Sequence, residues 1–217
     1  MPKFSRALLA RAKKIKLLLL DVDGVLTDGN IYYLSRSGGG MFETKGFHAR
    51  DGLGIRLAHR HGIKTGIITG RASPVIEHRV KELGIHFLQQ SALEKLEPYE
   101  RIRLAAQVED QEVCYVGDDI VDLPLLKRVG LAVSVANGHE LLRRHVHFKT
   151  ARPGGAGAVR EVIELILIAQ GKWSGIMKSY MKGDPVLHHK PEDEDAMAYR
   201  LRAESDQHLP LPEDSAQ

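Results

Sequence analysis

Cysteine and long hydrophobic runs are nearly absent from this sequence of 217 residues. The single cysteine, Cys114, excludes an internal disulfide and fits a reducing compartment, so we expect a cytoplasmic protein. The longest hydrophobic segment, residues 162–169, is interrupted by Glu164 and is too short to cross a bilayer. The N-terminus has basic residues but no hydrophobic core or small-residue cleavage site. We therefore predict neither a signal peptide nor a membrane partner.

Basic runs interleaved with aromatic residues are also absent, although the net charge is +3. The charge is unevenly distributed, because residues 181–217 contain nine acidic and four basic side chains. The rest of the chain is therefore more basic than the whole, which suits an anionic partner. Without clusters of basic and aromatic residues, we favour a phosphate-bearing metabolite over nucleic acid.

Composition divides the chain into one domain and a tail. A chain of this length suits a single domain with some residues to spare. From about residue 182 onward large hydrophobic residues are scarce, and Glu, Asp, His and Pro are frequent. We therefore predict a folded domain over residues 1–181 and a disordered acidic tail over residues 182–217.

Strand-like and helix-like segments alternate along the predicted domain. Strands are expected at residues 16–22, 63–69, 86–90, 113–117 and 131–135. Helices are expected at residues 5–14, 52–61, 74–83, 98–108 and 156–170. Ser73 is the predicted N-cap of the third helix, and an extension of the last helix to Tyr180 is left open. This alternation predicts an α/β fold with a doubly wound, mostly parallel sheet.

A glycine-rich segment interrupts this alternation after the first strand. Residues 30–35 and 41–47 are short extended segments on either side of Arg36-Ser37-Gly38-Gly39-Gly40. Glycine-rich turn chemistry between two extended segments predicts a β-hairpin insertion with a mobile tip.

The most informative segment is a run of four leucines that ends on two carboxylates, Leu17-Leu18-Leu19-Leu20-Asp21-Val22-Asp23. A continuous apolar run of this length predicts a strand that is buried on both faces. Carboxylates at the end of such a strand cost folding energy unless a cation or hydrogen bonds satisfy them. The segment therefore predicts a site that holds a hard metal ion and attacks an electrophile.

Polar residues also follow the other predicted strands. Thr69-Gly70-Arg71 ends the second strand, Lys95 comes just after the third, and Gly117-Asp118-Asp119 ends the fourth. Each has an ordinary explanation, since an Asp pair can cap a helix and a lone lysine is usually at the surface. Because the carboxyl ends of parallel strands meet at one edge, we expect these residues to share a site with Asp21.

Phosphoryl transfer is the chemistry that this set of side chains can perform. A carboxylate such as Asp21 can form an aspartyl-phosphate, and Asp21 and Asp118 offer the oxygen ligands that suit Mg²⁺. Lys95 and Thr69 can hold the phosphoryl oxygens. Asp23 can protonate the leaving alcohol and later activate water.

These segments resemble the motifs of the haloacid dehalogenase superfamily of phosphatases. Asp21-Val22-Asp23-Gly24-Val25-Leu26-Thr27-Asp28-Gly29 is similar to the first motif, and Thr69, Lys95 and residues 117–122 are similar to the second, third and fourth. Residues 47–54, 69–71 and 154–161 are similar to the branch that acts on 3-deoxy sugar acid phosphates. The resemblance covers roughly residues 16–170 and implies a Rossmann-like fold, with no insertion here that is large enough for a cap domain.

The resemblance also implies roles for individual residues. Asp21 would be the nucleophile and a Mg²⁺ ligand, Asp23 the acid/base and a ligand through its backbone carbonyl, and Asp118 the remaining ligand. Thr69 and Lys95 would clamp the phosphoryl group, supported by Asp119 and by Asp122, which would orient Lys95 or a metal-bound water. The implied substrate-binding residues are Asp23, His48, Ala49, Arg50, Asp51, Gly52, Arg56, Arg71, Arg79 and Lys95. Guanidinium groups suit both the carboxylate and the phosphate of a sugar acid phosphate, although Arg56 and Arg79 are equally well explained as solvated helix residues.

The implied reaction is hydrolysis of 3-deoxy-D-manno-octulosonate 8-phosphate in the lipopolysaccharide precursor pathway. The branch forms homotetramers, in which the hairpins would build a barrel and residues 154–157 would reach a neighbour's pocket, although a flexible turn explains those glycines equally well. One alternative is a phosphatase of a nine-carbon sialic-type acid phosphate, against which Arg71 argues. Another is a non-catalytic oligomerisation module, against which the intact set of Asp21, Asp23, Lys95 and Asp118 argues.

The sequence departs from the pattern of this branch in three places. The hairpin tip is a few residues longer, the acidic tail is additional, and the usual Gln-Gly before the motif-three lysine is Gln90-Ser91. None of these differences removes a catalytic group. Ser91, in place of the usual glycine, bears on the geometry of the loop that holds the phosphate.

Overall fold

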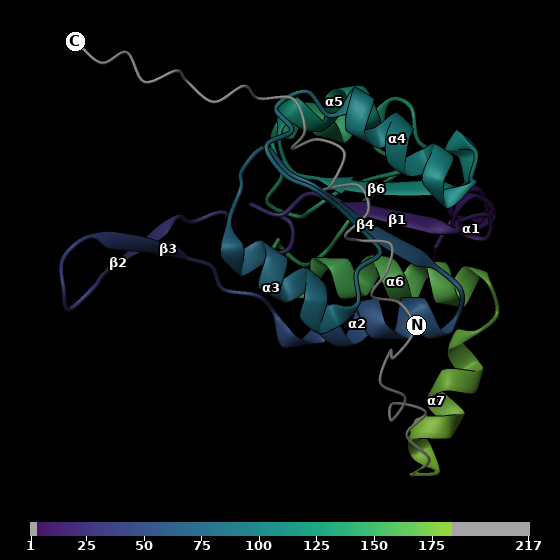
Figure 1. Cartoon of the computed structure of the whole chain (residues 1–217). Helices are drawn as coiled ribbons and strands as arrows, with labels where there is room; N and C mark the ends of the chain where they lie inside the picture. Colours follow the sequence, from purple (N-terminus) through teal and green to yellow (C-terminus); the bar gives the residue numbers. More distant parts are fainter. Residues whose placement is uncertain (1–3, 184–217) are drawn as a thin grey trace.

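The computed structural model describes residues 4–183, and its centre is a six-stranded sheet (Figure 1). The strands follow the order β5-β4-β1-β6-β7-β8, and every neighbouring pair is parallel. Their bounds are β1 Leu17–Leu20, β4 Lys64–Ile68, β5 Phe87–Gln89, β6 Val113–Gly117, β7 Leu131–Ser134 and β8 Phe148–Lys149. The predicted α/β fold with a parallel sheet is confirmed.

Helices cover both faces of this sheet (Figure 1). One layer contains α1 Arg6–Ala12, α2 Ala49–Arg60, α3 Pro74–Leu83 and α6 Ala158–Ala169, and the opposite layer contains α4 Leu96–Ala106 and α5 Leu123–Leu126. Each layer packs on the sheet through its own hydrophobic core. Because parallel strands need helical crossovers, this double coverage follows from the alternation of strands and helices.

Strand β1 lies between the two cores. Leu18 and Leu20 belong to the core beneath α2 and α6, whereas Leu17 and Leu19 belong to the core beneath α4 and α5. All four leucines are completely buried, as predicted for a strand covered on both faces. From β1 the chain continues to β4 and β5 on one side, and it then crosses to β6 on the other side of β1. The carboxyl end of β1 is therefore the topological switch point, where open α/β sheets bind ligands.

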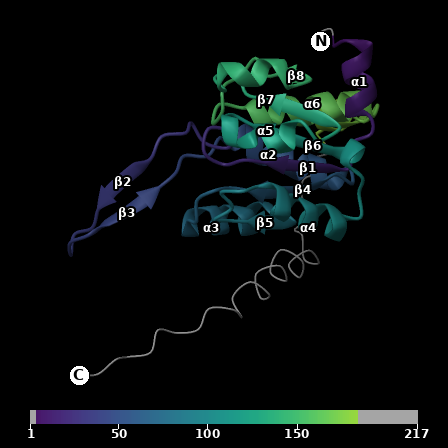
Figure 2. The same cartoon turned by 90° about the horizontal axis from the view of Figure 1, so that it is seen from above.

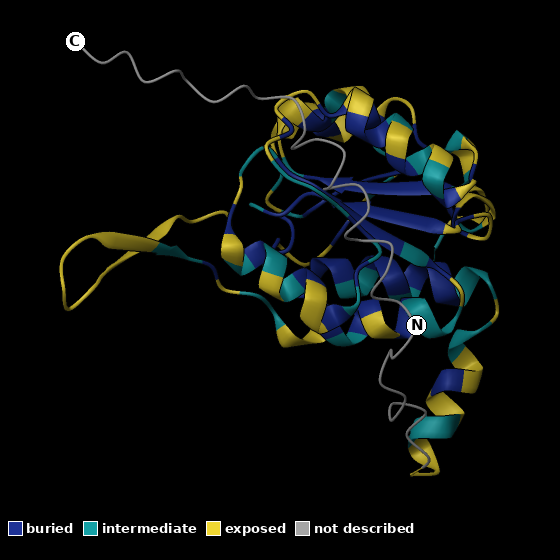
Figure 3. Ribbon diagram, viewed as in Figure 1, coloured by how far each residue is buried: buried dark blue, intermediate teal, exposed yellow. Residues whose placement is uncertain are grey.

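The predicted hairpin is present as an antiparallel pair, β2 Tyr32–Ser35 and β3 Met41–Thr44. Arg36 N donates to Gly40 O at 3.0 Å to close the turn, and Gly39 and Gly40 have φ angles of +90° and +83°, which glycine adopts readily. Figure 2 shows the hairpin projecting from the body of the molecule, and Figure 3 shows that most of it is exposed.

The structure gives the end of the last predicted helix, which was left open, and confirms Ser73 as the N-cap of the third. The last helix does not continue to Tyr180: α6 ends at Ala169, Gly171 has a φ of +72°, and a separate helix α7 Trp173–Met181 follows. Ser73 is at the N-cap of α3, but its side chain makes no capping hydrogen bond. Its backbone N–H donates instead to Gln90 Oε1 at 2.8 Å, which joins the start of α3 to the end of the β5 segment.

Several short elements were not predicted, namely α5, β8 and 3₁₀ helices at Asp110–Glu112, Ile120–Asp122 and Glu140–Arg144. The tail predicted for residues 182–217 lies, from residue 184 onward, outside the described residues. Within residues 4–183, none of the helices combines the length and the hydrophobicity needed to span a membrane.

Candidate active site

Strand register brings the predicted site residues to one edge of the sheet. Leu20 pairs with Ile67 on one side and with Val116 on the other, so Asp21, Thr69 and Asp118 follow the three strands within one residue of the same level. A cavity of about 220 Å³ lies at this edge. The predicted residues that line it are Asp21, Asp23, Thr69, Arg71, Lys95, Asp118 and Asp119.

Asp21 is the first residue after β1, and its carboxylate is fixed by two donors. Val22 N donates to Oδ1 at 2.7 Å, and Lys95 Nζ lies 3.1 Å from Oδ2. Burial raises the pKa of Asp21 to about 6, although the charge of Lys95 opposes the rise. The lysine therefore helps to keep this buried carboxylate in the ionised form that a nucleophile requires.

Lys95 is itself held by an acidic partner behind the cavity. Its Nζ donates to Asp122 Oδ1 at 2.7 Å and to Tyr115 Oη at 3.1 Å. Burial lowers the pKa of Lys95, but Asp21 and Asp122 outweigh this effect and the net pKa is raised. Lys95 therefore carries its charge next to Asp21 even though its side chain is almost completely buried.

Asp122 is completely buried and accepts four hydrogen bonds. Besides the bond from Lys95, Oδ1 accepts from Tyr115 Oη at 2.6 Å, and Oδ2 accepts from the backbone N–H groups of Asp118 and Asp119 at 2.9 and 3.2 Å. Asp122 therefore connects Lys95 to the loop that follows β6. Tyr115 was missed by the sequence analysis, because a tyrosine inside a buried strand carries no signal of its own.

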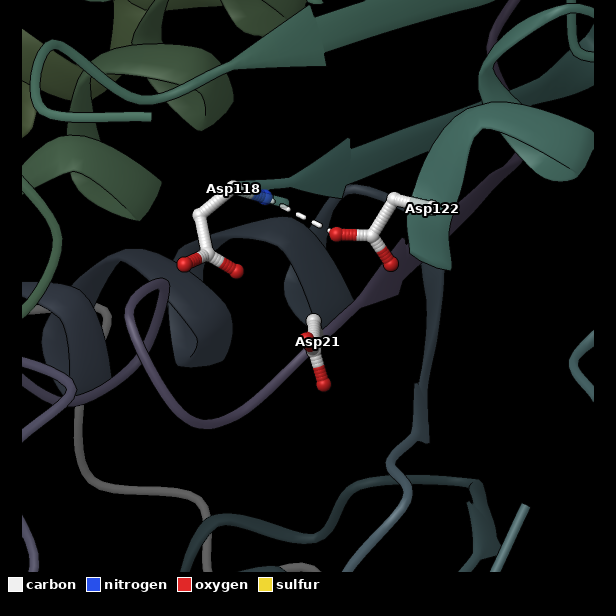
Figure 4. A group of neighbouring side chains, drawn as sticks. All are labelled: Asp21, Asp118 and Asp122. Atoms are coloured by element: carbon white, nitrogen blue, oxygen red, sulfur yellow. Dashed lines mark hydrogen bonds between the residues drawn. The ribbon is translucent and has the colours of Figure 1, made fainter. Parts of the chain in front are cut away.

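The carboxylates of Asp21, Asp118 and Asp122 form a group in which one oxygen atom from each lies within 4.8 Å of the other two (Figure 4). Burial, together with the charges of Asp21, Asp122 and Asp119, raises the pKa of Asp118 to about 7. Gly24 has a φ of +89° and leaves room for this carboxylate, because a Cβ there would lie 2.2 Å from Asp118 Oδ2. Crowded carboxylates beside one another fit a hard divalent cation, which would relieve their repulsion.

Asp23 lies at the mouth of the cavity, between two cations. Lys45 Nζ lies 2.5 Å from its Oδ1, and Arg71 Nε lies 3.9 Å from its Oδ2. The sequence did not point to Lys45, because it lies at the base of the hairpin, away from the ends of the sheet strands that carry the site and outside every motif. Its side chain is nevertheless completely buried against Asp23.

Part of the predicted substrate-binding set lies away from this cavity within the single chain. His48 caps α2, with Nδ1 accepting from Arg50 N at 3.2 Å, while Ala49 and Arg50 are exposed in the first turn. The side chain of Asp51 is buried, and its Oδ1 accepts from Arg160 N at 2.7 Å near the start of α6. Asp51 therefore joins α2 to α6 instead of facing the cavity.

The two predicted helix arginines share one glutamate. Arg79 Nη1 donates to Glu82 Oε2 at 2.8 Å, and Arg56 Nη2 donates to the Glu82 carbonyl at 3.3 Å. Arg79 also lies over the ring of Phe47, and it passes so close to Gly52 that a Cβ there would be 2.6 Å from Nη2. These contacts join α2 to α3 within the chain.

The glycine-rich segment at residues 154–157 is tied down within its own chain. Gly155 N donates to Val25 O at 3.0 Å, and Gly154 N donates to Asn137 Oδ1 at 2.9 Å. A Cβ on Gly154 would lie 1.6 Å from the carbonyl oxygen of Gly24. Close approach to the loop after Asp23 therefore explains these two glycines better than a flexible turn does, while a contact of this segment with a neighbouring subunit stays a prediction.

Fold and site together define a class: a Rossmann-like α/β enzyme with an acidic, lysine-containing site at the switch point of a parallel sheet. A family model described as haloacid dehalogenase-like hydrolase matches residues 49–130. The 3-deoxy-D-manno-octulosonate 8-phosphate phosphatase of Yersinia pestis is 45% identical over 165 residues, which cover 76% of this chain and 86% of the relative. The corresponding protein of Escherichia coli K12 is 45% identical over 168 residues, or 77% of this chain and 87% of that protein.

Solved structures agree with these relatives. The crystal structure of the Y. pestis phosphatase superposes with a TM-score of 0.75 at 43% identity, covering 79% of this chain and 91% of that one. The Moraxella catarrhalis phosphatase, solved with a magnesium ion, a phosphate ion and a KDO molecule, superposes with a TM-score of 0.76 at 39% identity, covering 82% and 99%. The chain belongs to the haloacid dehalogenase-like hydrolases, in the group that contains the 3-deoxy-D-manno-octulosonate 8-phosphate phosphatases.

Proposed function

We propose that this protein is a Mg²⁺-dependent phosphatase that hydrolyses 3-deoxy-D-manno-octulosonate 8-phosphate to the free sugar acid and phosphate, a step in making lipopolysaccharide precursors. The observation that carries the proposal is the Asp21 carboxylate at the end of β1, 3.1 Å from Lys95 Nζ and on the wall of the cavity. The similarity to phosphatases of this sugar acid, one of them solved with its product components, supports the substrate.

The first half of the reaction transfers the phosphoryl group to Asp21. An Asp21 carboxylate oxygen attacks phosphorus, and the bond between phosphorus and the ester oxygen breaks. Asp23, in its acid form, gives its proton to the departing oxygen, which leaves as the alcohol of the sugar acid. Lys95 and Thr69, which both line the cavity, hold phosphoryl oxygens as their charge is redistributed.

The second half regenerates the enzyme. Asp23, now a carboxylate, accepts a proton from water as the water oxygen attacks phosphorus. The bond between phosphorus and Asp21 breaks, which releases inorganic phosphate and restores both carboxyl groups to their starting states. Asp23 thus acts as acid in one step and as base in the next.

The residues that would hold Mg²⁺ are Asp21 and Asp118, with the backbone carbonyl of Asp23. When bound, the ion supplies positive charge that offsets the repulsion between the Asp21 carboxylate and an anionic phosphate ester. Asp122 is committed to four hydrogen bonds from other groups, so its role is to orient Lys95 and the loop after β6.

The quaternary structure we propose is a cytoplasmic homotetramer built through the hairpin. Six of its large hydrophobic side chains are exposed in the single chain, from 37% for Phe42 to 72% for Met41. Exposed apolar residues gathered on one projecting element are typical of an interaction surface. A neighbouring subunit would close the cavity against water and bring exposed residues such as Arg50 toward the sugar acid.

Phosphate release from the eight-carbon 8-phosphate and from a nine-carbon 9-phosphate, measured side by side, tests the proposal. We expect the larger kcat/KM for the eight-carbon ester, loss of activity in EDTA with recovery on adding Mg²⁺, and no detectable turnover by Asp21→Asn. Circular dichroism checks that the variant is folded. Activity that survives EDTA would contradict the metal dependence, and a preference for the nine-carbon ester would contradict the substrate.

A further inference from the structure

Four charged side chains form a closed ring at the mouth of the cavity. Asp23 contacts Lys45, Lys45 contacts Glu43, Glu43 contacts Arg71, and Arg71 lies next to Asp23 again. When Asp23 is a carboxylate, as in its role as base, the signs of charge alternate around the ring and each member is flanked by two opposite charges. Lys45 and Glu43 come from the hairpin, Asp23 from the loop after β1, and Arg71 from the loop after β4.

Lys45 is the best fixed member of this ring. Its side chain is 0% exposed, and its Nζ lies 2.5 Å from Asp23 Oδ1 and 3.1 Å from Glu43 Oε1. Glu43 Oε2 in turn accepts from Arg71 Nη2 at 2.5 Å. A buried ammonium is tolerated only when it is paired, and both of its contacts here are carboxylates. The buried position of the Lys45 ammonium therefore depends on its ion pairs with Asp23 and Glu43.

Lys45 does not line the cavity, whereas Asp23 and Arg71 do. Its contact with the site therefore runs through the Asp23 carboxylate. One oxygen of Asp23 is taken up by Lys45, which leaves the other, Oδ2, on the side of Arg71 at 3.9 Å. The Asp23 side chain is 22% exposed, and the contact with Lys45 is the shorter of its two ion pairs, so Lys45 favours one rotamer of Asp23.

We propose that Lys45 is a positioning residue for the acid/base Asp23, and that Glu43 supports it by joining Lys45 to Arg71. This inference rests on the proposed function, because it takes Asp23 as the group that protonates the departing alcohol. Lys45 fixes one carboxylate oxygen so that the other is presented to the ester oxygen. The hairpin thereby contributes to chemistry at a residue about twenty positions earlier in the chain.

The consequence depends on how much the leaving group needs a proton. A sugar alcohol leaves as a strongly basic alkoxide unless it is protonated, whereas p-nitrophenolate leaves without assistance. A displaced general acid therefore slows alkyl esters selectively. The ratio kcat/KM covers the steps up to release of the alcohol, so it separates this effect from later hydrolysis of the aspartyl-phosphate.

The experiment compares Lys45→Met with wild type on 3-deoxy-D-manno-octulosonate 8-phosphate and on p-nitrophenyl phosphate, both with Mg²⁺. We expect kcat/KM for the sugar acid ester to fall about 10- to 100-fold, and kcat/KM for p-nitrophenyl phosphate to change less than about threefold. In an Asp23→Asn background, Lys45→Met should cause almost no additional loss, because two residues that act as one unit are not additive.

Two further variants distinguish a loss of Asp23 positioning from a general structural effect of losing a buried charge. Glu43→Gln breaks the ring without removing the lysine and should give a smaller loss with the same selectivity for the alkyl ester. Lys64→Met is the matched control: Lys64 is a partly buried lysine at the start of β4, the end of that strand away from the cavity, and its loss should leave both esters unaffected.

Equal losses on both esters, no loss on either, or additive losses in the Asp23→Asn background would each overturn the inference. If the wild-type enzyme hydrolysed neither ester, that result would instead contradict the proposed function. The two failures are therefore distinguishable in one set of assays.

Discussion

Tyr115 and Asp122 lie behind the cavity and influence it through Lys95. The Tyr115 hydroxyl donates to Asp122 Oδ1, which also accepts from Lys95, so one oxygen atom joins the tyrosine to the lysine. Removal of the hydroxyl leaves a buried carboxylate with one donor fewer. A hydrogen bond to a charged group contributes about 1.5–3 kcal/mol to stability.

For Tyr115→Phe we therefore expect a loss of about 1.5–3 kcal/mol in the free energy of unfolding. We also expect a roughly tenfold fall in kcat, equivalent to about 1.4 kcal/mol in the barrier, because Lys95 is less well oriented toward Asp21. Urea denaturation and phosphate release measure the two quantities.

Tyr99→Phe is the matched control for this prediction. Tyr99 is also completely buried, and its hydroxyl donates to Asp110 Oδ1 at 2.6 Å, but Asp110 precedes β6 at the edge of the sheet away from the cavity. This variant should lose stability and keep its kcat. If Tyr99→Phe and Tyr115→Phe reduce kcat equally, the proposed link through Lys95 is wrong.

Ser91 is the departure from the branch pattern that has a structural cost. It has a φ of +57°, in the left-handed region that glycine occupies without strain. In this region a residue with a Cβ destabilises the folded state by about 1–2 kcal/mol. Ser91→Gly should therefore stabilise the protein, with a rise in the thermal midpoint of about 2–4 °C for each kcal/mol recovered.

Ser174→Gly is the comparison for this change, because Ser174 is exposed within helix α7, where glycine weakens the helix. The two substitutions should shift the thermal midpoint in opposite directions. A midpoint for Ser91→Gly at or below that of wild type would show that the left-handed serine carries no strain.

At the scale of elements, the strands and long helices could be predicted because each carries a local signal. The four leucines of β1 mark burial on both faces, and Pro74 and Gly84 mark the ends of α3. The four-residue helix α5 and the two-residue strand β8 are too short for any periodicity to be visible.

The site residues likewise fall into those that local sequence predicts and those that it does not. Asp21, Thr69, Lys95 and Asp118 were predicted to lie together because each follows a parallel strand, and the structure places all four on one cavity. Lys45, Glu43 and Tyr115 reach the site only through tertiary contacts, which have no counterpart in local sequence. The position of Asp51 against α6 likewise depends on packing between two helices that are distant in sequence.

The loop that contains Gly154 offers a test at this scale. A Cβ at this position would meet the Gly24 carbonyl at 1.6 Å, so the loop after Asp23 would have to move. We expect Gly154→Ala to lower stability by about 1–3 kcal/mol and to reduce kcat, measured by thermal denaturation and phosphate release.

Gly175→Ala is its control, since nothing lies within 4 Å of a Cβ at that helical position. Alanine there should raise stability slightly and leave kcat unchanged. A Gly154→Ala variant with wild-type activity would mean that the two loops are not coupled.

At the scale of the whole molecule, the exposed hairpin sets the expected assembly. Leu34→Glu combined with Met41→Glu places two charges on side chains that are 48% and 72% exposed in the single chain. If the hairpins meet in a tetramer, burial of these charges is costly and the assembly should dissociate. Light scattering coupled to size exclusion measures the mass.

Leu104→Glu is the matched control, because Leu104 is 65% exposed on α4, which belongs to the body of the molecule and not to the hairpin. This variant should keep the mass of the wild type. A wild-type protein that elutes as a monomer, or a double variant that stays tetrameric, would contradict the proposed assembly.

The central position of β1 has a consequence for amide hydrogen exchange. Its backbone is covered by two cores and paired on both sides, so its amide protons exchange only when the whole domain opens. In a single chain the hairpin that carries Lys45 is a two-stranded ribbon with little buried surface, so without a neighbouring subunit it belongs among the first segments to open. Asp21 therefore follows the strand whose amide protons should exchange most slowly, whereas Lys45, which positions Asp23, comes from a segment whose amide protons should exchange fast. A local opening of the hairpin would therefore impair proton transfer by Asp23 before it disturbed Asp21.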